Sequence, residues 1–229
     1  MSTQAIVVAA GPGSRLPGPV VKPLINLKKK PLFIYCLQVF DEVALIDSVI
    51  LVVSREHVDE FKRALNKYKI NKSVRIVEGG PTRCQSVRNG LKNLDEKTSY
   101  VLIHDGVRPF ARKELVREAI ILAQKEKAVV VGVPVKPTIK EINVHDMTVR
   151  KTPDRNQLWE VQTPQIFSKD IIAKAHEENQ DLNVTDDAVL VEKLGIRVKM
   201  IQGRYDNIKI TTQEDLRLAE ALLDNQNSR

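Results

Sequence analysis

Short runs of β-branched and other apolar residues recur along the chain, and stretches with apolar residues at helical spacing separate them. Such runs are typical of strands buried on both faces of a sheet. The expected strands cover residues 5–10, 48–54, 74–79, 100–105, 128–135 and 197–203. The expected helices cover residues 31–40, 56–68, 82–94 and 112–127. This alternation predicts an α/β fold with a parallel, doubly wound sheet, which receives its ligands at the carboxyl ends of the strands.

Residues 138–153 break this alternation. They consist of two short β runs around a polar turn at His145 and Asp146, which predicts a hairpin arm that leaves the sheet. Such an arm can embrace a second copy of the chain, or it can lie on the surface as a flap. The sequence pattern leaves both interpretations open.

Two helix starts carry pairs of residues at the spacing of a capping box. Thr82 and Gln85 mark the start of the third expected helix. Residues 207–223 are expected to form a last strand and a final helix, whose start is marked by Thr211 and Glu214.

The composition fits a folded protein that attracts anions. A chain of 229 residues can bury one sizeable core, so one α/β domain is favoured over two small ones. The net charge of +7 attracts nucleic acid, anionic lipid or small phosphorylated molecules. Aromatic residues make up only 4% and the basic residues are dispersed, which argues against a nucleic-acid partner.

Cysteine content and hydropathy argue against a cysteine-bound metal site and against a membrane protein. Cys36 and Cys84 have no partner at metal-ligand spacing, so each is expected to be a small core residue. No apolar run reaches the roughly 18 to 20 residues that span a bilayer, so no membrane partner is expected. We expect a cytoplasmic protein, or one of an organellar stroma if a transit segment was removed.

The first expected strand ends in a glycine-containing loop, "GPGSRLPGPVVK". Leu16 replaces the third glycine of a dinucleotide fingerprint, and Lys28 to Lys30 stand where a ribose-binding acid is expected, so an NAD site is disfavoured. No Gly-Lys-Ser/Thr follows, which excludes a P-loop. Arg15 and Lys22, seven residues apart, can clamp a triphosphate from both sides. The alternative is a glycine turn with two solvated basic residues.

Two further turns carry candidate chemistry. Asp105 ends the strand at 100–105, where a carboxylate can hold a magnesium ion that bridges phosphates, and Arg108 can bind a phosphate bidentately. In the alternative, Asp105 caps the turn and Arg108 neutralises it. The backbone of the turn at Gly80, with Ser86 after it, can read the edge of a base, although a plain turn is nearly as good an interpretation.

Together these residues resemble a known family, the 2-C-methyl-D-erythritol 4-phosphate cytidylyltransferases. The segments that carry the resemblance are "AAGPGSRL", "KPL", "GGPTRCQSV", "IHDGVRPF", "VPVKPTIKEI", "DRNQLWEVQTPQIF", "VTDDAVLVEKLG" and "NIKITTQEDLRLAEA". They occur in order and span nearly the whole chain. The resemblance implies a Rossmann-like, mostly parallel sheet with a protruding β-hairpin arm, in a single nucleotidyltransferase domain over residues 1–229. The arm, at about 138–156, would interlock two subunits of a homodimer.

The family's reaction joins CTP to 2-C-methyl-D-erythritol 4-phosphate, a polyol phosphate of the non-mevalonate isoprenoid pathway. It gives 4-diphosphocytidyl-2-C-methyl-D-erythritol and pyrophosphate, with Mg²⁺ as the divalent cation. The nucleophile is already an anionic phosphate oxygen, so catalysis would rest on positioning and on electrostatic stabilisation.

The resemblance also implies roles for individual residues. The nucleotide would be bound by Ala9, Ala10, Gly11, Gly13, Gly80, Ser86 and Asp105. Charge developing at the α-phosphorus would be stabilised by Arg15 and Lys22, and the attacking phosphate would be held by Lys209 and by Arg155 from the partner's arm. The polyol phosphate would be bound by Asp105, Arg108, Thr138, Arg155, Thr163 and Lys209. Asp105 would be the metal ligand.

The chain departs from the family pattern at two positions. Pro23 follows the loop lysine, whereas the family usually has a proline before it, and Pro137 replaces a usual aspartate. A D-ribitol 5-phosphate cytidylyltransferase shares most of the motifs and is the main alternative, although Trp159 favours the methylerythritol enzymes. The segment "NIKIT" disfavours a sugar-1-phosphate nucleotidyltransferase. A basic nucleic-acid-binding protein is the alternative from another class.

Overall fold

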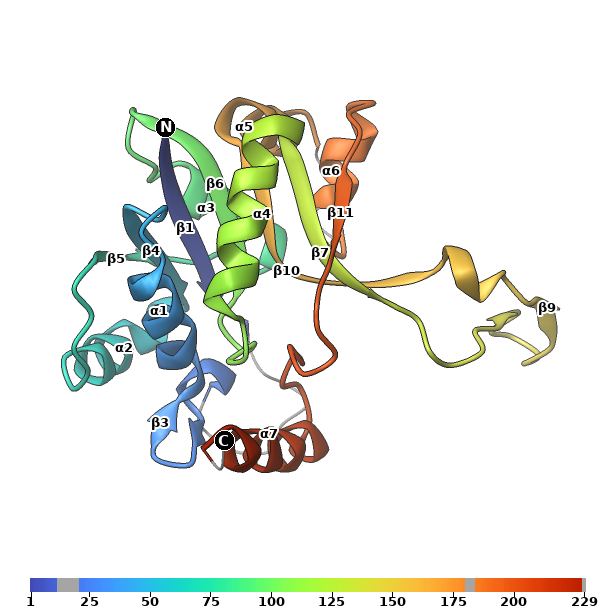
Figure 1. The fold of residues 1–229 in the computed structure, drawn as a ribbon, viewed down its shortest axis with the longest axis horizontal. Coiled ribbons are helices and arrows are strands. Elements are labelled where there is room, and N and C mark those ends of the chain that lie inside the picture. Colours follow the sequence, from blue (N-terminus) through green and yellow to red (C-terminus); the bar gives the residue numbers. More distant parts are fainter. Residues whose placement is uncertain (12–20, 180–183, 228–229) are drawn as a thin grey trace.

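The computed structural model describes residues 1–11, 21–179 and 184–227 (Figure 1). The strands of its main sheet are β1 (Ser2–Ala9), β4 (Ser48–Val53), β5 (Ser73–Glu78), β6 (Thr98–Asp105), β7 (Ala128–Pro134), β10 (Trp159–Ser168) and β11 (Lys199–Gln202). These seven strands lie in the order β11-β7-β10-β6-β1-β4-β5. Every neighbouring pair is parallel except the two that involve β10, which runs antiparallel to β6 and β7. The prediction of a mostly parallel α/β sheet is therefore confirmed.

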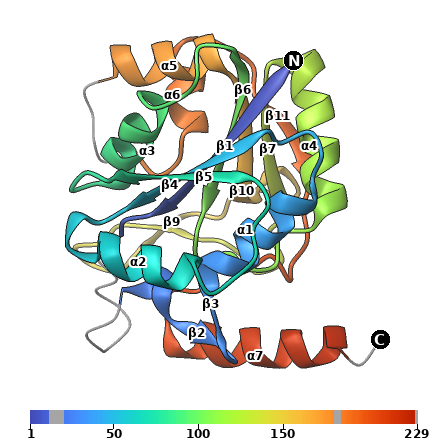
Figure 2. The ribbon, with the colours of Figure 1, turned by 90° about the vertical axis from the view of Figure 1, so that its left-hand side faces the viewer.

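Helices cover both faces of this sheet (Figures 1 and 2). One face carries α1 (Leu32–Glu42) and α4 (Lys113–Glu126), and the other carries α3 (Arg83–Leu91), α5 (Lys169–Glu178) and α6 (Ala188–Lys193). The short helices are η1 (Lys22–Leu24), η2 (Arg55–His57), α2 (Val58–Leu65) and η3 (Arg155–Gln157). Thr82 caps α3, because its Oγ1 accepts a hydrogen bond from the Gln85 amide at 3.1 Å. The other half of the predicted capping box is not formed, since Gln85 Oε1 has no hydrogen-bond partner among the residues that the structure describes.

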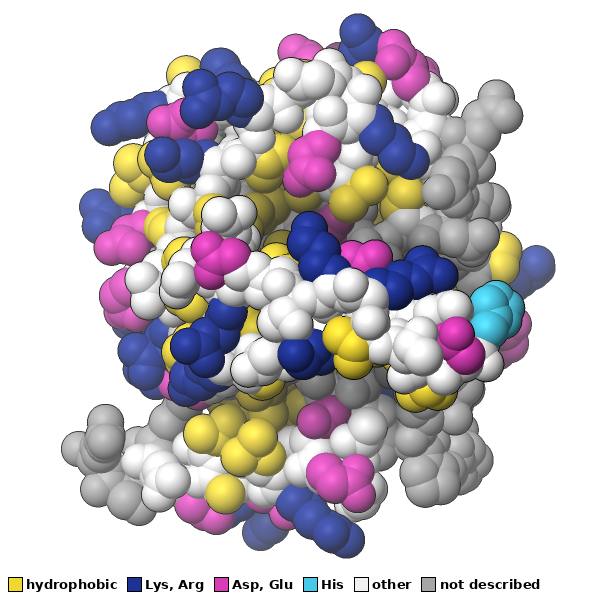
Figure 3. Space-filling model, turned by 90° about the vertical axis from the view of Figure 1, so that its right-hand side faces the viewer, with side chains coloured by type: hydrophobic (Ala, Val, Ile, Leu, Met, Phe, Trp, Pro, Cys, Tyr) yellow, Lys and Arg dark blue, Asp and Glu magenta, His cyan; other side chains and the backbone are white. Residues whose placement is uncertain are grey.

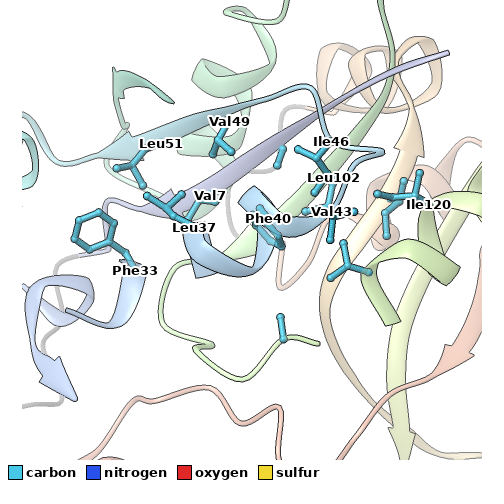
Figure 4. Close-up of a cluster of buried hydrophobic side chains, with 14 of the residues drawn as sticks. Val7, Phe33, Leu37, Phe40, Val43, Ile46, Val49, Leu51, Leu102 and Ile120 are labelled. Atoms are coloured by element: carbon cyan, nitrogen blue, oxygen red, sulfur yellow. The ribbon is translucent and has the colours of Figure 1, made fainter. Parts of the chain in front are cut away.

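Successive residues of β1 contribute to different cores, because side chains alternate between the faces of a strand. Val7 packs with Phe33, Leu37 and Phe40 of α1 in the first core (Figure 4). Ile6 belongs to the second core, which α3, α5 and α6 cover. Cys36 and Cys84 are both buried, so the prediction that they fill core positions is confirmed.

The structure differs from the predicted strands at the edges of the sheet and at β10. β5 and β11 are the edges of the sheet and are only partly buried, whereas we expected burial on both faces. β10 was not predicted, because Gln162, Thr163 and Gln165 give it no apolar run, although all three side chains are buried.

The end of the chain forms a third core below the sheet. Helix α7 (Gln213–Asn227) packs near the hairpin of β2 (Asn26–Leu27) and β3 (Lys30–Pro31), as Figure 2 shows. No strand forms at residues 207–210, in contrast to the prediction. The capping pair of α7 is also shifted by one residue, because Thr212 and Asp215 form it instead of Thr211 and Glu214. The Asp215 carboxylate accepts a hydrogen bond from the Thr212 amide at 2.9 Å. In return, Thr212 Oγ1 accepts a hydrogen bond from the Asp215 amide at 3.3 Å.

The predicted hairpin arm is confirmed. Its strands β8 (Glu141–Ile142) and β9 (Val149–Lys151) pair antiparallel, and the arm projects from the body (Figure 1). Figure 3 views this side of the molecule, where Lys and Arg side chains lie among acidic and polar ones. At the tip of the arm, the side chains of Val144 and Met147 are 72% and 70% exposed. Within the described ranges, no helix has the length and apolar character of a membrane span.

Candidate active site

Two cavities adjoin at the carboxyl edge of the sheet, where β1 and β6 end. The first has a volume of about 320 Å³ and the second about 370 Å³. Arg83, Asp105 and Lys209 line both of them. A ligand that fills both cavities would therefore pass Asp105.

The first cavity brings together most of the residues predicted for a nucleotide. Its described lining consists of Val8, Ala9, Ala10, Gly11, Lys22, Pro23, Gly80, Pro81, Thr82, Arg83, Ser86, Asp105, Val107, Lys209, Ile210 and Thr211. Gly13 and Arg15 fall within 12–20, outside the described residues. Lys22, at the start of η1, is 9% exposed and lines this cavity.

The turn after β5 is held tightly against β1. A Cβ at Gly79 would lie 2.4 Å from Ala10 Cβ, so only glycine allows this approach. Ser86 Oγ accepts the Gly80 amide at 3.1 Å and donates to the Thr82 carbonyl at 2.9 Å. The serine therefore fixes the main chain of this turn, which leaves a preformed set of backbone polar groups beside the cavity.

Asp105 lies among three cations at the end of β6. Its Oδ1 is 3.1 Å from Arg83 Nε, and its Oδ2 is 2.8 Å from Lys209 Nζ and 3.6 Å from Arg108 Nε. Burial opposes ionisation of this carboxyl, but the charges of Arg83, Lys209 and Arg108 outweigh it and hold its pKa well below the usual range. Asp105 thus carries a permanent negative charge that fixes three positive groups at the crevice.

Arg83 lines both cavities, although no role was predicted for it from the sequence. Its Nη1 lies 2.7 Å from Asp187 Oδ2, and the other carboxylate oxygen of Asp187 lies 3.0 Å from Nε2 of the buried His176. Burial opposes the charge of Asp187, but Arg83 and His176 more than compensate, so its pKa is lowered. No local pattern signals this pair, because 104 residues separate its members.

A chain of hydrogen bonds orients the residues behind Asp105. The Asp105 amide donates to Thr163 Oγ1 at 3.1 Å, and Thr163 Oγ1 lies 3.0 Å from His104 Nδ1. His104 Nε2 lies 3.1 Å from the Arg108 carbonyl, which can only accept, so Nε2 carries the hydrogen and Nδ1 accepts from the threonine. Burial lowers the pKa of His104 to about 4, so this imidazole is neutral near pH 7.

The second cavity combines cationic and acidic groups. Its described lining consists of Arg83, Asp105, Arg108, Val161, Gln162, Thr163, Gln165, Thr185, Asp186, Val189, Glu192 and Lys209. Arg108, Thr163 and Lys209 were predicted for a polyol phosphate, whereas Gln165, Thr185, Asp186 and Glu192 were assigned no role from the sequence. The cations suit a phosphate, and the acidic and amide groups can bind hydroxyls.

Two predicted residues lie elsewhere in the chain. Thr138 is exposed on the arm, and Arg155 lies in η3 at the base of the arm, where its Nη1 donates to the Lys136 carbonyl at 3.0 Å. Neither residue belongs to the described lining of the two cavities. Arg155 instead lines a separate cavity with Trp159 and Tyr205.

The described lining of the first cavity offers one carboxylate to a metal ion. Among the described residues that line the first cavity, Asp105 is the only acidic one. The described part of the chain contains no group of three or more His, Cys, Asp or Glu that could hold a metal ion. A divalent cation here would need oxygens from a ligand as well, which is how Mg²⁺ is usually bound beside substrate phosphates.

Comparisons with known proteins agree on one family. A family model described as 2-C-methyl-D-erythritol 4-phosphate cytidylyltransferase matches residues 3–225. An enzyme of that name from Clostridioides difficile is 45% identical over 95% of this chain and 92% of its own length. One from Caldanaerobacter subterraneus is 43% identical, over 97% and 99%. The crystal structure of 4-diphosphocytidyl-2C-methyl-D-erythritol synthase from Anaerococcus prevotii is 39% identical, with a TM-score of 0.86 over 97% of this chain and 96% of that one.

Proposed function

Because the chain belongs to the 2-C-methyl-D-erythritol 4-phosphate cytidylyltransferase family, we propose that its two cavities hold the two substrates of that reaction. The chain is a cytidylyltransferase of the non-mevalonate pathway and uses CTP and 2-C-methyl-D-erythritol 4-phosphate. CTP would occupy the first cavity and the polyol phosphate the second. The observation that carries this assignment is that the cavities adjoin and share Arg83, Asp105 and Lys209.

The reaction exchanges one phosphoanhydride bond for another. A phosphate oxygen of the polyol phosphate forms a bond to the α-phosphorus of CTP, and the bond from that phosphorus to the oxygen bridging to the β-phosphorus breaks. Pyrophosphate leaves with the electron pair of that bond. No proton must be removed from the nucleophile, so the reaction needs no general base. His104 is accordingly free to act as a structural residue, and both of its ring nitrogens are hydrogen-bonded within the fold.

Recognition of cytosine would rest on the main chain of the first cavity. The backbone of Ala9, Ala10 and Gly11 and the turn at Gly80 present amide and carbonyl groups, and Ser86 holds that turn in place. Because these groups are fixed before the ligand binds, they lose little conformational entropy on binding.

Stabilisation of the transition state would come from preorganised cations. Lys209 is held at 2.8 Å by Asp105, and Lys22 lines the cavity from the opposite loop. Positive groups that are already oriented stabilise developing charge without reorganising during the reaction. We assign Lys22 to the α-phosphorus and Lys209 to the attacking phosphate, with Arg15 as a further cation from the loop outside the described residues.

Magnesium would bind at Asp105 together with the triphosphate. When bound, it neutralises phosphate charge and orients the leaving pyrophosphate. The ionised Asp105 suits this role, since Mg²⁺ is usually held by one or two carboxylates plus substrate phosphates. Turnover is expected to stop in excess EDTA and to return when Mg²⁺ is added; unchanged turnover in EDTA would remove the metal from the mechanism.

The arm would complete the site of a second subunit. Thr138 and Arg155 lie on the arm, away from both cavities of their own chain, as expected if they reach the polyol phosphate of a partner. We therefore propose a homodimer. Sedimentation equilibrium is expected to give twice the chain mass of 25.8 kDa, whereas the single mass would contradict the proposal.

The substrate is tested by turnover. The protein is incubated with CTP, Mg²⁺ and either 2-C-methyl-D-erythritol 4-phosphate, D-ribitol 5-phosphate or a sugar 1-phosphate, and pyrophosphate release is followed. We expect release with the methylerythritol substrate. Release with ribitol 5-phosphate alone would refute this choice, and salt-sensitive DNA binding without any turnover would favour the nucleic-acid alternative.

A further inference from the structure

The segment between β11 and α7 carries Lys209 and is tied to the sheet along its length. We call residues 203–211 the strap. The Gly203 amide donates to the Gly132 carbonyl at 2.6 Å, and the Ile210 amide donates to the Val107 carbonyl at 3.0 Å. Gln162 Nε2 donates to the Arg204 carbonyl at 2.9 Å. The strap is therefore held to β7 and β10 at one end and to the turn after β6 at the other, although it forms no strand.

Asn207 is a buried residue of the strap that bonds to two residues lining the second cavity, Thr163 and Arg108. It is 1% exposed, and its Nδ2 donates to the Thr163 carbonyl at 2.9 Å and to Gln162 Oε1 at 3.2 Å. Its main-chain carbonyl accepts Arg108 Nη1 at 2.8 Å. One residue thus contacts both Thr163 and Arg108, and it precedes Lys209 by two positions.

We infer that Asn207 is a positioning residue that fixes Thr163, Arg108 and Lys209 relative to one another for the polyol phosphate. The inference rests on the proposed function, because these three residues are the ones assigned to that substrate. Asn207 is absent from the described lining of both cavities, so its effect would be indirect. The strap also lines the first cavity through Lys209, Ile210 and Thr211, but the groups assigned to cytosine, at Gly80 and Ser86, are held by a hydrogen bond to each other.

The chemistry of the position calls for an amide. Both oxygens that face Asn207 Nδ2 are acceptors, so a carboxylate at this position would place oxygen against oxygen at 2.9 and 3.2 Å. An apolar side chain would leave the Thr163 carbonyl and Gln162 Oε1 with lost hydrogen bonds. Gly203 leaves room for the hydrogen bond between Asn207 and Gln162. A Cβ at this position would lie 2.6 Å from Gln162 Oε1 and would displace that oxygen.

The test compares Asn207→Ala and Asn207→Asp with a matched control at the other end of the sheet. Gln4 is also a buried amide, 3% exposed, and it hydrogen-bonds to Ser48 at 2.7 Å and to Asp95 at 3.1 Å. Gln4→Ala therefore removes a comparable buried network without touching the crevice. Each variant is characterised by kcat, by KM for each substrate, by calorimetric binding of CTP and by its midpoint of urea unfolding.

If Asn207 positions the second cavity, both Asn207 variants lower kcat/KM for the polyol phosphate by about tenfold or more, the scale of a lost buried hydrogen bond. The KM and the affinity for CTP stay within about twofold of the wild type. Gln4→Ala lowers the unfolding midpoint and leaves both KM values unchanged. A purely structural role for Asn207 predicts the same behaviour as Gln4.

Three results would overturn the inference. Asn207 variants with unchanged kinetics, or with kcat/KM lowered equally for both substrates, would show that the residue does not position the second cavity. Variants that do not fold would show that Asn207 serves stability instead. Failure of the wild type with 2-C-methyl-D-erythritol 4-phosphate would instead refute the proposed substrate. The same comparison would then be made with whichever polyol phosphate the wild type uses.

Discussion

Replacing Arg83 by methionine is expected to destabilise the fold, because a buried carboxylate loses its cationic partner. Arg83 Nη1 lies 2.7 Å from Asp187 Oδ2, and the two side chains are 22% and 1% exposed. Asp105 keeps Arg108 and Lys209, so most of the loss falls on Asp187, which retains His176. Removing one partner of a buried ion pair costs about 3–5 kcal/mol, and we expect a loss of that size in the free energy of unfolding.

A double variant separates this effect from lost packing. Asp187→Asn removes the charge that Arg83→Met leaves uncompensated. The free energy of unfolding should therefore fall less in the double variant than the sum of its falls in the two single variants. We expect a difference of about 1 kcal/mol or more.

The assay is urea unfolding followed by far-ultraviolet circular dichroism. Arg112→Met is the matched control. Arg112 pairs with Asp206 at 3.0 Å, but the Arg112 side chain is 42% exposed. The free energy of unfolding should therefore fall by no more than about 1 kcal/mol in this variant. An Arg83→Met loss no larger than that of the control would refute the reasoning. Strict additivity in the double variant would show that charge is not the cause.

Three further outcomes are expected. Lys22→Ala should lower kcat by about 10²–10³-fold with the fold intact, whereas the exposed Lys113→Ala should not; near-normal turnover would remove Lys22 from the mechanism. Burial raises the pKa of Cys36 to about 12, so this thiol and the buried Cys84 should react with a disulfide reagent only in urea, and rapid labelling of the native protein would contradict their burial. The pKa of Asp187 is lowered by Arg83 and His176 against the effect of burial, so its carboxylate stabilises the fold above its ordinary value of 3.8 and loses this contribution as the pH falls below it. Asp187→Asn should flatten the acid limb of the stability curve, and an unchanged acid limb would show that other groups cause it.

The sheet was predictable where both faces of a strand are covered by helices. There, burial favours apolar residues on both faces, and the middle parts of β1, β4, β6 and β7 show such runs. The same physics explains why β10 was missed. Its buried polar residues Gln162, Thr163 and Gln165 are bonded to partners far along the chain, which a local pattern cannot show.

The site was predictable where it follows strand ends. Residues 9–11 at the end of β1 and Asp105 at the end of β6 meet because their strands are neighbours in the sheet. Arg83 and Asp187 could not be paired from the sequence, since their contact depends on how α3 and α6 pack. Residues 207–210 alternate polar and β-branched side chains, a pattern typical of a strand, but they form no ladder: the Ile210 amide bonds to Val107 in the turn after β6, and the Asn207 side chain bonds to the Thr163 carbonyl of β10.

A crystal structure with CTP and Mg²⁺ tests the central claim most directly. The account predicts cytosine in the first cavity beside Gly80 and Ser86, with the triphosphate toward Lys22 and the metal at Asp105. The second cavity, at Arg108 and Lys209, would remain open for the polyol phosphate. CTP bound in the second cavity, or a triphosphate directed away from Lys22, would contradict it.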